Sequence, residues 1–130
     1  MKRRTAREKA LQALFQIEIG KADVQESMEN VLDGMEKDEY FDFLVTGTTG
    51  NMETIDQTIT SHLENWKLER LAAIDRNLLR LAVFEMTFSE DVPVNVIMDE
   101  AIEIAKTFGD DQSPKFVNAV LSKVKDESSK

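Results

Sequence analysis

A chain of 130 residues, of which 42% are hydrophobic, is long enough to bury one core, and nothing in it indicates a second independent domain. The absence of cysteine excludes disulfides and thiolate metal sites, and no apolar run suits a signal peptide or a membrane span, so we expect one cytoplasmic domain over residues 1–130. The net charge of −9 argues against general attraction to nucleic acid, but residues 1–10 carry five basic side chains against one acid.

The first predicted helix runs from about residue 3 to residue 19 and ends at Gly20, for which we expect a left-handed conformation. One arc of this helix is apolar, and a neighbouring arc carries Arg4, Arg7, Leu11 and Phe15. Two interpretations of the second arc are open. Either Leu11 and Phe15 widen the core and the arginines are solvated, or the arc is a basic and aromatic ridge that holds phosphate and offers a docking surface.

Capping residues mark the next helices. Asp23 is the expected N-cap of a second helix and Asp38 that of a third. The third helix leads into residues 46–50, where two glycines and three threonines predict a break or a distortion. A fourth helix follows from about residue 51 to residue 64, and we interpret Trp66 after it as a packing anchor.

The stretch from Asp75 to Phe88 is apolar on nearly all sides and is therefore the expected central helix. Asp75 is the expected cap of its amino terminus. Glu85 falls among apolar positions of this helix, so it requires a hydrogen-bonding or basic partner that the sequence does not identify.

Two more helices complete an all-α fold class with about six or seven helices. One is expected from Pro93 to Phe108, and the last has Ser113 as N-cap with Pro114 at its first position. We divide the domain into a subdomain of amino-terminal helices (1–65), a subdomain of carboxy-terminal helices (66–126) and a frayed tail (127–130).

The chain offers no convincing catalytic or metal-binding set. His62 is the only histidine, and the acidic run Asp99-Glu100-x-x-Glu103 lacks the histidines that a helical di-metal site uses. We therefore predict a binding module that is not an enzyme and needs no cofactor.

Several distinct motifs follow one another over most of the chain. They are Arg3-Arg4-x-Ala6-Arg7, Asp75-Arg76-x-x-Leu79-Arg80, Glu100-Ala101-Ile102-Glu103-Ile104-Ala105-Lys106 and Ser113-x-Lys115-Phe116-Val117-Asn118. Together they resemble the NusB family of bacterial transcription antitermination factors. The resemblance implies two small helical bundles packed into one compact domain. It further implies pairing with NusE, a small-subunit ribosomal protein, and binding of single-stranded boxA RNA in nascent, notably ribosomal RNA, transcripts within an RNA polymerase antitermination complex.

Carried over position by position, the resemblance implies two sets of contact residues. The RNA-binding positions are Lys2, Arg3, Arg4, Arg7, Arg80, Gln112, Ser113, Lys115, Phe116 and Asn118. The positions facing NusE are Phe15 and Asp75. Basic side chains suit phosphate, and a phenylalanine beside a loop can stack on an unpaired base. Many family members carry Asp where Gln112 stands and His where Pro114 stands, so the neutral amide removes repulsion toward phosphate and any imidazole contact is missing.

Other interpretations stay open. One is a NusB-like RNA-binding module that works with a ribosomal RNA methyltransferase on another polypeptide, and another is a helical protein adaptor that binds no RNA. A DNA-binding helix-turn-helix fits less well, because its recognition helix needs polar residues that the central helix lacks. A homodimer of the free protein through its NusE surface is also open, and no membrane partner is expected.

Overall fold

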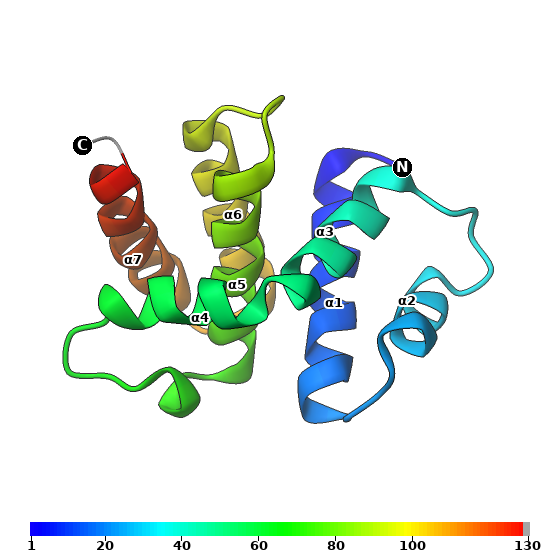
Figure 1. Ribbon diagram of the computed structural model, residues 1–130, viewed down its shortest axis with the longest axis horizontal. Coiled ribbons are helices and arrows are strands. Elements are labelled where there is room, and N and C mark those ends of the chain that lie inside the picture. The colour runs from blue at the N-terminus through cyan, green and yellow to red at the C-terminus, as the bar shows by residue number, and fades with distance from the viewer. Residues whose placement is uncertain (129–130) are drawn as a thin grey trace.

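The computed structural model describes residues 1–128, and this range contains seven α-helices, one short 3₁₀ helix and no strand (Figure 1). The elements are α1 (Arg3–Ile19), α2 (Val24–Leu32), α3 (Glu39–Gly50), α4 (Met52–Ser61), η1 (Leu68–Arg70), α5 (Ala73–Phe88), α6 (Val94–Phe108) and α7 (Ser113–Ser128). The all-α prediction is confirmed. Part of the predicted frayed tail lies outside the described residues, and α7 extends through residues 127 and 128. No helix within residues 1–128 is both long and apolar enough to cross a membrane.

The helix α5 is the centre of the packing, as its apolar sequence predicts. It contacts α1, α3, α4, α6 and α7, and every residue from Arg76 to Glu85 is buried. Figure 1 shows α5 between α1 on one side and α7 on the other. A helix covered on so many sides has no solvent face for polar residues, so those that it carries must find partners inside the protein.

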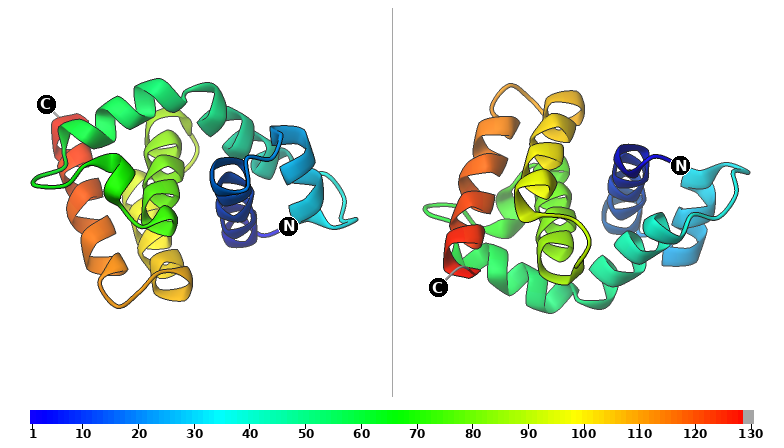
Figure 2. Two further views of the ribbon diagram at one scale, coloured as in Figure 1. Left: turned by 90° about the horizontal axis from the view of Figure 1, so that it is seen from below. Right: turned by 90° about the horizontal axis from the view of Figure 1, so that it is seen from above.

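The other helices form two groups around α5. On one side α1, α2 and α3 pack together, and on the other α6 and α7 pack together and against α5. Figure 2 shows α3 and α4 running in succession along one side of the molecule and joining the two groups. Because α4 contacts α5 and α7, the packing favours a boundary earlier than residue 65. The division into two subdomains stays a prediction.

Local capping sets the starts of α2 and α3. The Asp23 carboxylate accepts a hydrogen bond from the Glu26 amide at 3.3 Å, and that of Asp38 accepts one from the Phe41 amide at 2.9 Å. Both predicted caps are confirmed. The predicted left-handed Gly20 is wrong, because its φ is −83° and the following Lys21 takes the left-handed conformation with φ 53°.

Two other predicted caps are wrong. The helix α5 begins at Ala73, after extended residues, and no side chain caps it. Because this start lies two positions before Asp75, Asp75 is inside the helix and cannot be its N-cap. Asp75 instead lies in the first turn, where a carboxylate interacts favourably with the helix dipole. Ser113 is the first residue of α7 rather than its cap. The carboxylate of Asp110 accepts hydrogen bonds from the amides of Gln112 (2.8 Å) and Ser113 (3.1 Å).

The glycines and threonines of residues 46–50 do not interrupt α3, which contains all five. The break follows at Asn51, with φ −121° and ψ 20°. Gly47 is needed for space, since a Cβ there would lie 2.0 Å from Cζ of Phe84 on α5. The hydroxyls of Thr46 and Thr49 donate to carbonyls one turn earlier, as Thr49 does to Val45 at 2.9 Å.

Trp66 is not the packing anchor that the sequence predicts. Its side chain lies in the loop before η1 and is 59% exposed, whereas Leu68 and Leu71 are each 9% exposed. These leucines attach the loop to the core, and Arg76 donates a hydrogen bond of 2.7 Å to the Leu71 carbonyl. The two leucines, and not the tryptophan, therefore anchor this loop to the core.

Candidate nucleic-acid interface

The amino end of α1 presents three basic side chains. Lys2, Arg3 and Arg4 are all exposed. Arg4 donates through Nε to Glu100 on α6 at 2.9 Å, and the Arg3 guanidinium lies 3.7 Å from the ring centroid of Tyr40. These two contacts tie the basic end to α6 and α3 while leaving positive charge at the surface, as a phosphate-binding surface requires.

Arg7, one turn further along α1, is buried and is 4% exposed. It donates through Nε and Nη2 to the two oxygens of Glu85, at 2.8 Å and 2.6 Å. Tyr40 also donates to Glu85 at 2.5 Å, and Glu100 lies 3.4 Å from Arg7. Burial, together with the hydrogen bond to Glu85, raises the pKa of Tyr40. Glu85 thus has the basic partner that its buried position requires, and the expectation of such a partner is confirmed.

Arg80 occupies a second buried network and is 8% exposed. It donates to Glu18 of α1 at 2.5 Å and to Asp56 of α4 at 2.8 Å. Arg76 also donates to Glu18, at 2.5 Å. Partial burial opposes ionisation of Glu18, but the hydrogen bonds and charges of the two arginines outweigh it and lower the pKa of Glu18 to about 2. This network fastens α1 and α4 to the central helix.

The beginning of α7 contains the other predicted RNA residues. Gln112, Lys115 and Asn118 are exposed, and Lys115 has no ion pair within residues 1–128. Phe116 is half-buried against the core. Ser113 is 2% exposed, and its hydroxyl accepts a hydrogen bond from the Asp110 amide at 3.0 Å, so it stabilises the loop.

The two predicted partner residues are each half-buried. Phe15 lies on the arc of α1 that continues from Arg4 and Arg7, and Asp75 lies in the first turn of α5. Burial raises the pKa of Asp75; its interaction with Ser113 opposes this, and the nearby charge of Asp110 adds to it. The Oδ1 atom of Asp75 is buried and accepts no hydrogen bond from residues 1–128.

Comparison with known proteins identifies the family. The family model described as NusB matches residues 4–126 of the chain. The chain belongs to the NusB family. Transcription antitermination protein NusB of Bacillus licheniformis is 58% identical over 127 residues, which cover 98% of each protein. The protein of the same name from Bacillus subtilis is 55% identical over 127 residues, covering 98% of this chain and 97% of the relative. The resemblance is confirmed, and the family is one of antitermination proteins rather than enzymes.

Solved NusB structures share the fold. T. maritima NusB is 40% identical, with a TM-score of 0.91 over 98% of this chain and 92% of that chain. A chain in the crystal structure of antitermination factors NusB and NusE in complex with dsRNA is 28% identical, with a TM-score of 0.88 over 96% of each chain. The fold predicted for a NusB family member is therefore confirmed.

In this NusB-family chain the predicted RNA residues form separate groups. The exposed Lys2, Arg3 and Arg4 lie at the amino end of α1. Asp75 interacts with Ser113, so the starts of α5 and α7 lie together, and the contact of Glu18 with Arg76 places the carboxyl end of α1 beside the start of α5. Arg7 and Arg80 lie in the interior between these two ends.

Sequence reasoning did not find the carboxylates that hold the three buried arginines, Arg7, Arg76 and Arg80. Glu18, Asp56 and Glu100 come from α1, α4 and α6, and each looks like an ordinary solvated helix residue in the sequence. The one available signal was Glu85, because an acid inside an apolar helix demands a partner. Within residues 1–128, no group of three or more histidine, aspartate or glutamate side chains is placed to hold a metal ion.

Proposed function

We propose that the protein is a transcription antitermination factor that pairs with NusE and binds boxA RNA in nascent, notably ribosomal RNA, transcripts as part of an RNA polymerase antitermination complex. The observation that carries this proposal is the match over 96% of the chain to a NusB chain in a structure with NusE and dsRNA. The name that the curated relatives share, transcription antitermination protein, supports it.

The ten candidate RNA residues divide into two roles in this proposal. Lys2, Arg3 and Arg4 at one end, and Gln112, Lys115, Phe116 and Asn118 at the other, are at least partly exposed and contact the RNA. The interior Arg7, Arg80 and Ser113 act by positioning, because their polar groups are already bonded to protein atoms. Single-stranded RNA suits a surface whose cations and aromatic side chain are spread along the molecule.

The partner surface in this proposal contains Phe15 and Asp75. A half-buried aromatic side chain gives a protein partner apolar area to cover. The half-buried carboxylate of Asp75, which makes no ion pair within residues 1–128, gives it a negative charge for a basic side chain of the partner. A homodimer of the free protein through the same surface stays a prediction.

We test the RNA surface with the double variant Lys2→Ala/Lys115→Ala, because neither lysine has an ion pair within residues 1–128. Affinity for boxA RNA is measured with NusE at several salt concentrations. We expect weaker binding. The negative slope of log affinity against log salt should also become shallower, by about 0.7 for each lost phosphate contact.

The matched control is Lys21→Ala/Lys37→Ala, which removes the same charge from exposed positions outside the candidate surface. Equal losses in the two double variants would show that only net charge matters and that the RNA surface is misplaced. Binding of NusE without any RNA binding would favour the adaptor interpretation.

We test the partner surface with Phe15→Ala and Asp75→Asn. Each should weaken NusE binding about tenfold or more, which corresponds to about 1.4 kcal/mol. Because burial disfavours the charged form of Asp75, the asparagine variant should keep or raise the stability of the free protein while losing affinity. Calorimetric titration and thermal melting measure the two quantities. Met35→Ala, which removes a 45% exposed apolar side chain elsewhere, is the control, and unchanged affinity in both test variants contradicts the assignment.

A further inference from the structure

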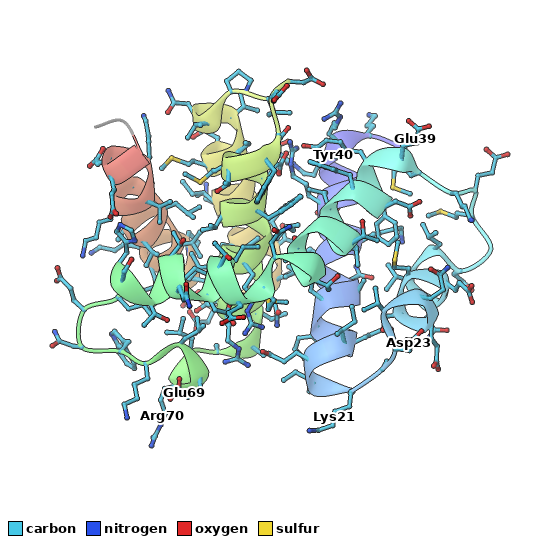
Figure 3. The ribbon with its side chains drawn as sticks, in the orientation of Figure 1. Lys21, Asp23, Glu39, Tyr40, Glu69 and Arg70 are labelled. Carbon is cyan, nitrogen blue, oxygen red and sulfur yellow. The ribbon has the colours of Figure 1, made fainter. Side chains whose placement is uncertain are left out.

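A solvent-open hollow of about 680 Å³ lies where the amino ends of α1 and α3 meet the carboxyl end of α5. Three segments line it, namely Met1, Arg3 and Ala6 at the amino end, Asp38, Glu39, Tyr40 and Phe43 at the start of α3, and residues 88–91. Figure 3 labels Glu39 and Tyr40 at the first turn of α3, beside the start of α1. The candidate partner residues Phe15 and Asp75 do not line this hollow.

The lining combines aromatic rings with acids. The rings of Tyr40 and Phe43 lie 5.6 Å apart, and Phe88 is 44% exposed although its ring stacks on Phe84 at 5.0 Å. Among the described residues no ion pair or hydrogen bond engages the exposed carboxylates of Glu39, Glu90 and Asp91. The unpaired acids repel phosphate and attract cations, and the exposed ring adds an apolar surface on which a cation can also lie. The lining therefore favours a ligand that is both cationic and apolar.

The protein's own cations already show how such a ligand is held. The Arg3 guanidinium lies 3.7 Å from the Tyr40 ring centroid, and the amino-terminal ammonium lies 3.6 Å from the Asp38 carboxylate. These contacts satisfy one ring and one acid. The three remaining acids and the exposed face of Phe88 have no corresponding partner.

We infer that this hollow is a docking site for a cationic segment of a protein partner in which arginine or lysine alternates with apolar side chains. Charge complementarity carries the inference, because four carboxylates against Arg3 and the terminal ammonium leave the lining with a net charge of −2. The apolar side chains of the segment cover Phe88, and its cations pair with Glu39, Glu90 and Asp91.

The probe is a short labelled peptide of alternating arginine and leucine, and its counterpart of alternating glutamate and leucine is the reference. Fluorescence anisotropy measures binding to the full chain. We expect the arginine peptide to bind and the glutamate peptide to fail. Glu90→Lys/Asp91→Lys should raise the dissociation constant of the arginine peptide at least tenfold, and Phe88→Ala should raise it several-fold.

The matched control is Glu26→Lys/Asp99→Lys, which makes the same change in net charge at exposed positions on α2 and α6. It should change the dissociation constant less than threefold. Equal weakening in the two charge variants, or equal binding of the two peptides by the unaltered chain, overturns the proposal. Circular dichroism melting confirms that each variant is folded.

A second comparison uses the internal contact. Arg3→Ala frees the Tyr40 ring and should tighten peptide binding more than Lys2→Ala, which removes the same charge without uncovering a ring. Identical effects contradict the role of Arg3 as an internal occupant. If sedimentation instead shows self-association that Phe88→Ala abolishes, the hollow is an interface between copies of the chain and the proposal is wrong.

Discussion

The paired side chains of Arg7 and Glu85 are 4% and 1% exposed, and they are held by several hydrogen bonds. Such a pair does not necessarily stabilise a protein more than apolar residues of the same volume would. Removal of one partner, however, leaves a buried charge without compensation. The position of these two residues in the fold therefore makes Arg7 important for stability, whatever its role toward RNA.

We predict that Arg7→Ala lowers the free energy of unfolding by about 3–5 kcal/mol, because Glu85 would keep only Tyr40 as a donor. Arg4→Ala removes an arginine whose side chain is 49% exposed and should cost less than about 1 kcal/mol. Urea unfolding measures both. Equal losses would mean that the burial of Arg7 carries no energetic weight.

At the scale of the helices, the contact of α3 with α5 depends on a missing side chain. Glycine inside a helix usually costs up to about 1 kcal/mol relative to alanine, so Gly→Ala is normally stabilising there. At Gly47 the added Cβ meets the Phe84 ring, whereas at Gly50 it meets nothing within 4 Å. The two glycines of one helix thus have opposite consequences.

Gly47→Ala should destabilise the protein by about 1–3 kcal/mol, because Phe84 or the whole of α3 has to shift. Gly50→Ala should be neutral or stabilising by less than about 1 kcal/mol. Thermal melting of the two variants provides the comparison. A stabilised Gly47→Ala protein would show that Phe84 adapts without cost.

The elements were largely predictable because their signals are local. Apolar spacing and the capping residues Asp23 and Asp38 depend only on neighbouring positions, and the helices that they predict are present. The buried networks were not predictable, since Arg80 meets Asp56 and Glu18 only after α1, α4 and α5 have packed together. Trp66 and Asp75 were misplaced for the same reason, because exposure and the start of α5 depend on tertiary packing.

For the molecule as a whole, the link between α1 and α5 through Glu18 makes stability depend on pH. The folded state lowers the pKa of Glu18 from 4.5 to about 2, so the folded state binds fewer protons in this range than the unfolded state does. This contribution is complete above about pH 4.5 and is lost as the pH falls through about 2. Acidification below about pH 4.5 therefore weakens the attachment of α1 to α5.

Glu18→Gln should accordingly lower stability at neutral pH and flatten the fall in stability between about pH 4.5 and 2. Urea unfolding across this range measures the effect, and Glu29→Gln, an exposed acid of α2, is the control. If the slope against pH is the same in Glu18→Gln and the unaltered chain, another group carries the acid dependence.

The central position of α5 also determines which parts of the molecule can open separately. Its residues from Arg76 to Glu85 are covered by five helices, so their amide hydrogens exchange with solvent only when most of the structure comes apart. The nine-residue α2 packs mainly on α1 and α3. We therefore expect a slowly exchanging centre and a peripheral helix that opens more readily, without disturbing either end of the candidate RNA surface.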